Sequence, residues 1–199
     1  MTSELSLEIA AAAARWVVEE GMEYGPAKRR AARDVAGRSS RKAELPSNTE
    51  VETEVRAYLE LFCADTQPAE LAALREVAAV WMQRMADFRP HLTGAVWRGT
   101  ATKLNNIHLQ LYCDDSKAAE LALIDKGVDY EVGSVTGPRG DEVSVLSASS
   151  PCRVLNENVT VHMSVLDHDD LRGALKPDAL GRAERGDLRA LRALMEAAQ

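Results

Sequence analysis

The chain has few aromatic residues, few cysteines and no excess of positive charge. Its 199 residues include 3 Trp, 4 Tyr, 2 Phe and 3 Cys. Acidic residues outnumber basic ones, 31 to 24, which gives a formal net charge of -7. Proteins that bind nucleic acid over an extended surface usually carry the opposite charge, so nucleic acid is not an expected partner and any basic patch must be local.

The cysteine spacing and the lack of long hydrophobic runs exclude further classes of protein. Cys63, Cys113 and Cys152 are far apart and odd in number, and no Cys-x-x-Cys pair is present. This pattern favours free thiols in a reducing cytosol over a disulfide framework or a structural zinc site. The alanine-rich segment 5–18 contains charged residues and follows no basic leader, so it fits neither a signal peptide nor a membrane span. We expect a cytoplasmic protein with no membrane partner.

The first part of the chain carries the pattern of helices. Ser47 and Glu50, just after Pro46, have the spacing of a capping box, and apolar residues recur at helical spacing over residues 51–62. Further helices are expected over residues 5–20, over 27–35 and from about Pro68 to Pro90. Residues 1–90 are therefore predicted to be a helical N-terminal region.

After Pro90 the pattern changes to that of strands. Residues 92–97 form a short apolar run, which we interpret as a strand, and polar and apolar residues alternate over 106–113 and 159–165. The remaining predicted elements are a helix over 116–126, a hairpin of 130–135 with 142–146, and a last helix over about 184–197. The sequence predicts an α+β protein, with a helical N-terminal half packed on a small mixed β-sheet.

Three short features follow one another after the apolar run. They are the dipeptide Gly94-Ala95, a second glycine at Gly99, and Asn106-Ile107-His108 at the start of the alternating segment. This order resembles the core of the DNA polymerase β-like nucleotidyltransferase superfamily, whose motifs are Gly-Ser or Gly-Gly followed by Asp-x-Asp or Asp-x-Glu. The resemblance covers residues 92–166. It implies a sheet of nucleotidyltransferase type in a core of residues 91–170, followed by a C-terminal tail and helix over 171–199, and Mg²⁺ as the family's cofactor.

The residues at the family's metal positions differ from the family pattern. Carboxylates at i and i+2 of a strand share one face, where they can hold two Mg²⁺ ions. Asn106 and His108 stand at those positions, and a neutral amide and an imidazole are poor ligands for Mg²⁺. The third acid of the family comes from a later strand, where this chain offers Thr160, His162 and Ser164. The substitutions thus remove the charge that gathers the metal ions.

Three hypotheses of function follow. The first is a nucleotidyltransferase-like protein with a degenerate metal site at Asn106, His108 and His162, which binds a nucleotide, a phosphorylated small molecule or a protein partner without catalysing transfer. The second is an active nucleotidyltransferase with an atypical ligand set. The third is a metal hydrolase, or a general acid and base, built on His108 and His162. Two histidines without a partnered carboxylate nearby are, however, more often ordinary residues of a polar sheet face.

Several other residues are candidates for ligand or metal binding. The predicted ligand-binding residues are Gly94, Ala95, Arg98, Gly99, Lys103 and Gln110. Asp114 and Asp115 lie roughly 20 Å along the strand from Asn106, so helix capping is their expected role. The acidic cluster at residues 167–170 suits either a metal ion or a solvated turn.

The strongest basic run is the remaining candidate. It comprises Lys28, Arg29, Arg30 and Arg33, with Arg38, Arg41 and Lys42 beyond. The run suits either phosphate binding or a solvated helix face. No aromatic residue interleaves with it, so it offers no platform on which nucleic-acid bases could stack.

Overall fold

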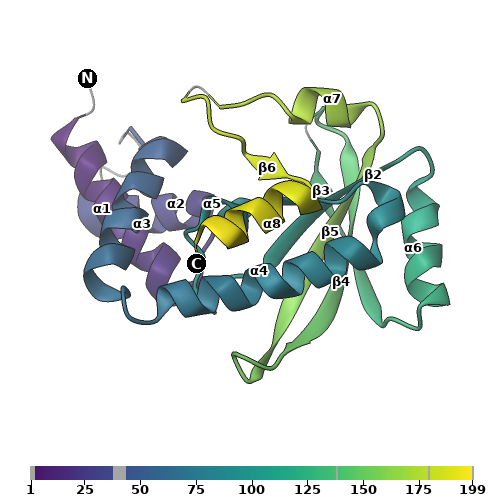
Figure 1. Ribbon diagram of the computed structural model, residues 1–199. Coiled ribbons are helices and arrows are strands. Elements are labelled where there is room, and N and C mark those ends of the chain that lie inside the picture. The colour runs from purple at the N-terminus through teal and green to yellow at the C-terminus, as the bar shows by residue number, and fades with distance from the viewer. Residues whose placement is uncertain (1–2, 38–43, 138, 179, 199) are drawn as a thin grey trace. The chain divides into compact units, whose positions relative to one another are not determined.

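The computed structural model of the protein describes residues 3–37, 44–137, 139–178 and 180–198. The chain divides into two compact units (Figure 1). The first unit runs to Ala69 and includes Thr100–Asn105, and the second comprises Glu70–Gly99 and the residues from Asn106 onward. This division falls inside the region 1–90 that the sequence predicts to be helical, because most of helix α4 (Gln67–Arg84) belongs with the sheet.

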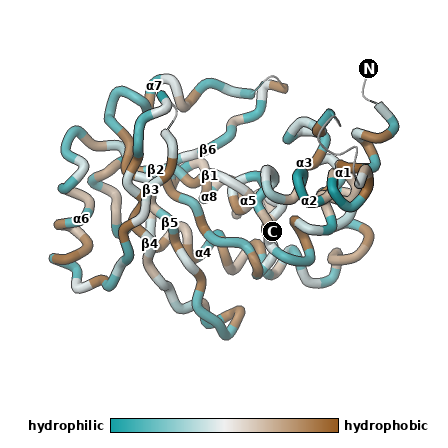
Figure 2. The backbone as a smooth tube through the Cα atoms, turned by 180° about the vertical axis from the view of Figure 1, so that it is seen from behind, coloured by the Kyte–Doolittle hydropathy of each residue, from teal (hydrophilic) through white to brown (hydrophobic). Residues whose placement is uncertain are grey.

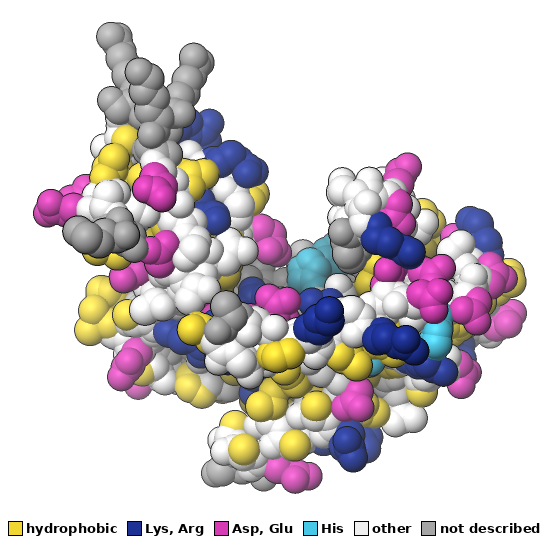
Figure 3. Space-filling view, turned by 90° about the horizontal axis from the view of Figure 1, so that it is seen from above, with side chains coloured by type: hydrophobic (Ala, Val, Ile, Leu, Met, Phe, Trp, Pro, Cys, Tyr) yellow, Lys and Arg dark blue, Asp and Glu magenta, His cyan; other side chains and the backbone are white. Residues whose placement is uncertain are grey.

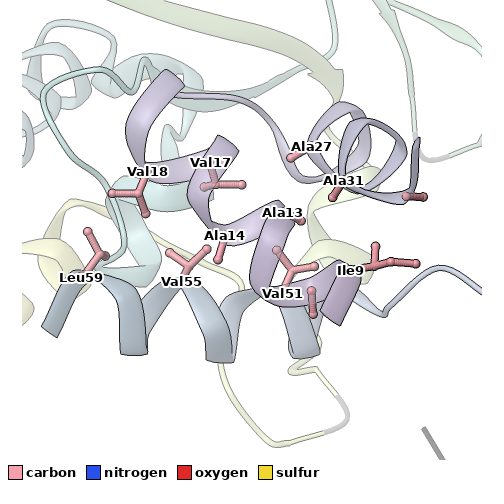
Figure 4. Packing of buried hydrophobic residues seen from close by; sticks show 12 residues of the cluster. Ile9, Ala13, Ala14, Val17, Val18, Ala27, Ala31, Val51, Val55 and Leu59 are labelled. Carbon is pink, nitrogen blue, oxygen red and sulfur yellow. The ribbon is translucent and has the colours of Figure 1, made fainter. Parts of the chain in front are cut away.

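The first unit consists mainly of α1 (Glu4–Glu20), α2 (Tyr24–Ala36) and α3 (Asn48–Phe62). Their shared core is rich in alanine and valine (Figure 4), and these short side chains let the helix backbones approach closely. The predicted capping box is confirmed: Glu50 N donates to Ser47 Oγ at 3.1 Å, and Ser47 N donates to Glu50 Oε2 at 2.7 Å.

The second unit is built on a mixed sheet of six strands in the order β3-β4-β5-β2-β1-β6. The strands are β1 (His91–Thr93), β2 (Ile107–Cys113), β3 (Tyr130–Thr136), β4 (Glu142–Cys152), β5 (Glu157–Asp167) and β6 (Arg185–Gly186). The β2–β5 pair is parallel and the other neighbouring pairs are antiparallel. The helices of this unit are α4, η2 (Ala86–Phe88), α5 (Gly94–Arg98), α6 (Ser116–Asp125), α7 (Asp170–Ala174) and α8 (Leu188–Ala197). The α+β class is as predicted.

The two faces of the sheet differ in character. On one face Ile107, Leu109 and Leu111 of β2 are buried and pair with buried residues of β5. The alternate residues of β2 and β5 are mostly polar and half-buried, as the period-two pattern predicts. Hydrophobic and hydrophilic residues alternate over short distances along the backbone (Figure 2). No helix among the described residues is both long enough and apolar enough to cross a membrane.

The sequence predicts a strand over the apolar run 92–97, but only the start of this run is in a strand. Strand β1 ends at Thr93, and Gly94, with a φ of +75°, begins the short helix α5, which contains Trp97. Glycine adopts this left-handed backbone conformation without the steric cost of a Cβ. A helix of five residues is too short for its 3.6-residue period to appear in an apolar run, which explains the wrong prediction.

The last helix is also shorter than predicted. Arg185 and Gly186 form β6, and Asp187 caps α8 by accepting a hydrogen bond from Ala190 N at 2.8 Å. The segment before α8 is fixed to α5, because Trp97 Nε1 donates to the carbonyl oxygen of Ala183 at 2.7 Å. A Cβ added to Gly186 would lie 2.1 Å from the Trp97 ring, so β6 requires glycine there. This packing adds Arg185 to the sheet.

Candidate functional site

The strand register lines up one residue from each of the six strands. Across the sheet from β3 to β6 these are Glu131, Ser147, His162, His108, Thr93 and Arg185, a row that we call the polar row. Directly paired residues point to the same face of a sheet, so both predicted histidines lie on one surface. Figure 3 shows histidine side chains exposed beside basic and acidic ones.

His162 is held by hydrogen bonds at both ring nitrogens. Asn106 Nδ2 lies 3.1 Å from His162 Nε2, and Ser147 Oγ lies 2.8 Å from His162 Nδ1. An amide nitrogen can only donate, so Nε2 is the unprotonated nitrogen and Nδ1 carries the proton that is donated to Ser147. In this arrangement the imidazole does not accept the proton of the Ser147 hydroxyl, so Ser147 is not activated as a nucleophile.

His108 lies between His162 and the start of α5. The two imidazole rings are stacked, with centroids 5.1 Å apart and planes inclined by 30°. On the other side, a Cβ added to Gly94 would meet the His108 ring at 3.6 Å. The backbone at Gly94 is therefore a direct neighbour of His108.

A buried arginine of α4 holds helix α5 in place through hydrogen bonds to its backbone. Arg75 Nε donates to the carbonyl oxygen of Val96 at 3.1 Å, and Nη2 donates to that of Trp97 at 3.2 Å. Burial lowers the pKa of the Arg75 guanidinium. These hydrogen bonds satisfy carbonyls at the C-terminal end of α5, where Gly99 closes the helix with a φ of +84°.

Gln110 is fixed by two donors on the same face. Tyr112 donates its hydroxyl proton to Gln110 Oε1 at 2.9 Å, and Arg185 Nη1 donates to the same oxygen at 2.8 Å. Burial raises the pKa of the Tyr112 hydroxyl, while the hydrogen bond and positive charge of Arg185 lower it. Because arginine can only donate, the orientation of the Gln110 amide is defined and its NH₂ group remains available to a ligand.

The other predicted ligand-binding residues are distributed between the two units. Ala95 and Arg98 are half-buried residues of α5, and Gly99 follows them. Lys103 is exposed and belongs to the first unit with residues 100–105. Of the predicted site residues, the structure brings Gly94, Asn106, His108 and His162 together. Gln110 lies on the same face of the sheet, where it pairs with Ser164.

The acidic residues near the strand ends have structural partners. Asp115 caps α6 by accepting from Lys117 N at 2.9 Å, as predicted. In the cluster at 167–170, Asp167 accepts from Asp169 N at 2.8 Å, and Asp170 pairs with Arg139 at 3.1 Å. Among the described residues no group of three or more His, Cys, Asp or Glu side chains could hold a metal ion.

Two members of the basic run on α2 are engaged within the first unit. Lys28 Nζ donates to the carbonyl oxygen of Pro46 at 3.0 Å and to Asn48 Oδ1 at 2.9 Å. The guanidinium of Arg30 lies 3.6 Å from the centroid of the Trp16 ring. Arg29 and Arg33 are exposed. The continuation of the run, Arg38, Arg41 and Lys42, lies outside the described residues.

Four residues of the polar row, Glu131, Ser147, Thr93 and Arg185, were not predicted as site residues, and two of them, Ser147 and Arg185, lie outside the predicted strands. The predicted strand 142–146 ends one residue before Ser147, whereas β4 continues to Cys152. Arg185 lies in the stretch that was predicted to be helical. Alternation of Ser147 with buried Leu146 and Ala148 could have extended the strand, but no pattern in the sequence indicates a two-residue strand such as β6.

A separate groove of about 500 Å³ lies between α4 and α8, and Glu76, Val80, Gln83 and Arg192 are among its lining residues. None of the predicted site residues lines it.

Comparison with known proteins finds no match: no family model, no curated protein and no solved structure matches the chain.

Proposed function

We propose that the sheet unit is a nucleotidyltransferase-like domain with a degenerate metal site, which binds a nucleotide or another phosphorylated ligand without transferring it. The carrying observation is the convergence of Asn106, His108 and His162. Asn106 hydrogen-bonds His162, which stacks on His108. Asn106 and His108 stand at the positions of the family's Asp-x-Asp motif, and His162 is one of the candidates for the position of its third acid. Gly94, a predicted ligand-binding residue, adjoins His108.

The residues at these positions do not fit Mg²⁺. Magnesium ions are held by carboxylate and other oxygen ligands, whereas this group supplies two imidazoles and one amide. The one acid of the polar row, Glu131, is exposed on β3, two strands away from His162 and so about 10 Å from it. This donor set argues against the hypothesis of an active nucleotidyltransferase.

The geometry also argues against a hydrolase that uses His108 and His162 as a metal pair. Both nitrogens of His162 already have hydrogen-bond partners in the chain. Stacked rings direct their nitrogen lone pairs side by side rather than toward one ion, and a third metal-binding side chain is missing from the described surroundings. Binding to the polar face is the function that these contacts support best.

Nucleotide binding without turnover is the first expected outcome. A nucleotide present at about 100 times its Kd should stabilise the protein by about 2.7 kcal/mol, because it binds the folded state alone. A thermal-shift panel of nucleoside mono-, di- and triphosphates measures this effect. Labelled ATP with Mg²⁺ should give no transfer in the same samples.

Matched histidine variants locate the binding. His108→Ala should weaken the shift, whereas His168→Ala should not, because His168 bonds Arg89 away from the polar row. If no nucleotide raises the melting temperature, the ligand-binding hypothesis is wrong and a protein-binding role is what is left of it. Mg²⁺-dependent transfer by the native protein would instead favour the active enzyme. Transfer gained only by the triple variant Asn106→Asp, His108→Asp and His162→Asp would support the proposed nucleotidyltransferase-like site.

A further inference from the structure

We propose that Arg185 is the anion-recognising residue of this site, so that the ligand is held chiefly by a phosphate group and not by its nucleoside. The inference rests on the proposed function and names the chemistry that the site recognises. It concerns a residue near the C-terminus, outside the stretch 92–166 that carries the nucleotidyltransferase resemblance.

The guanidinium of Arg185 lies over the polar face. Its Cα is on β6, yet Nη1 reaches across β1 to Gln110 Oε1 on β2 at 2.8 Å. Only 15% of its side chain is exposed. A guanidinium that is already fixed in place binds a ligand more favourably than one on a mobile surface side chain, because the side chain loses less conformational entropy on binding.

Two groups near Arg185 on this face can supply further hydrogen-bond donors. Gln110 uses its oxygen for Tyr112 and Arg185, which leaves its NH₂ group to donate. His108, two residues before Gln110, can donate when it is protonated. A phosphate, which only accepts hydrogen bonds when fully ionised, matches such a surface better than a neutral nucleoside does.

The charge balance of Arg185 is incomplete. The carboxylate of Glu184 lies 3.2 Å from Nη2, but its side chain is 56% exposed, so solvent screens the ion pair. Arg185 Nε is buried and has no hydrogen-bond partner among the described residues. The strands β1, β2, β4 and β5 add no carboxylate to this face. Asp170 of α7 is near enough to raise the pKa of Tyr112, but it pairs with Arg139, so Glu184 is the carboxylate with which an incoming phosphate competes for the guanidinium.

The test compares two arginine variants of the same charge change. Arg185→Gln should weaken binding of pyrophosphate and of AMP by about tenfold or more, the loss expected for a charge-assisted hydrogen bond. Arg182→Gln is the matched control, because Arg182 lies in the same segment but pairs with Asp178. Isothermal titration calorimetry with pyrophosphate, AMP and adenosine measures the three affinities for each protein.

A second variant keeps the test decisive if Arg185→Gln does not fold. Glu184→Gln removes the competing carboxylate from an exposed position, so it should tighten pyrophosphate binding. Equal affinities in Glu184→Gln and the native protein would overturn the inference, as would equal losses in the two arginine variants. Adenosine that binds as tightly as AMP would overturn it as well.

The outcomes also separate this inference from the proposed function. AMP binding that is indifferent to Arg185 leaves a nucleotide-binding protein and refutes the anion site. Pyrophosphate binding that depends on Arg185, without any contribution from a nucleoside, supports the anion site and refutes nucleotide recognition.

Discussion

His162 has two possible neutral tautomers, and its neighbours select one. With Asn106 Nδ2 at Nε2, the ring proton is on Nδ1 and faces Ser147 Oγ. The opposite arrangement, with Nδ1 unprotonated, would let the histidine accept the serine proton, which is the relationship that a serine nucleophile needs. A single proton position thus distinguishes a binding surface from a hydrolytic one.

Ser147→Ala tests this hydrogen bond. The substitution removes the acceptor of the half-buried Nδ1–H group, so we expect a loss of about 1 kcal/mol in the free energy of unfolding. Urea denaturation measures the loss. Ser149→Ala is the control: Ser149 is exposed on the same strand and face, and its replacement should cost about 0.5 kcal/mol or less.

Nitrogen NMR of the imidazole groups measures the tautomer directly. The native protein should show His162 protonated on Nδ1 at a pH where the ring is neutral. A proton found on Nε2 would contradict the assignment and would revive a nucleophilic role for Ser147.

Two short elements determine what the polar face contains. Helix α5, of five residues, turns Gly94 toward His108, and strand β6, of two residues, adds Arg185. Each depends on the other, because Trp97 of α5 packs directly on the backbone of Gly186. Both elements are defined by this contact more than by their own propensities, which are weak at such lengths.

Gly186→Ala should disrupt this contact. The added Cβ would overlap the Trp97 ring, so either the ring or β6 must move, at a cost of about 1–3 kcal/mol. The melting temperature and the affinity for pyrophosphate should both fall, because the displaced strand carries Arg185.

Gly173→Ala provides the comparison, since nothing lies within 4 Å of a Cβ at that position. It should leave the melting temperature unchanged or raise it slightly, because alanine is the better helix former in α7. A Gly186→Ala protein as stable as Gly173→Ala would mean that Trp97 and β6 do not pack as described.

The whole molecule carries a net charge of -7, and its basic side chains have local uses. Lys28 and Arg30 stabilise the helical unit, Arg75 is buried under α5, and Arg185 is committed to the polar face. Binding to nucleic acid requires several cations to neutralise consecutive phosphates. The average charge of the molecule opposes such binding.

We expect no binding to duplex DNA or RNA at physiological salt. A gel-shift assay and heparin chromatography measure this. Binding that weakens steeply as the salt concentration rises would contradict the prediction, and a double charge reversal, Arg29→Glu with Arg33→Glu, would then show whether the exposed face of α2 is responsible.

Elements with local signals could be predicted from the amino-acid sequence. The capping box at Ser47, the cap at Asp115 and the alternation over 106–113 and 159–165 each act within a few residues, so α3, α6, β2 and β5 could be predicted. The alternation also assigned His108 and His162 to polar faces. The type of residue at Asn106 and His108 likewise argued against Mg²⁺ without any coordinates.

Tertiary structure alone decided which polar residues meet. Strand order and register pair His108 with His162 and bring Ser147 beside them, and residues 15 to 56 positions apart in the chain become hydrogen-bond partners. Arg185 reaches Gln110 across 75 positions because β6 pairs with β1. Such contacts depend on the packing of Trp97 against Gly186 and on the pairing of distant strands, and no local pattern of residues encodes either.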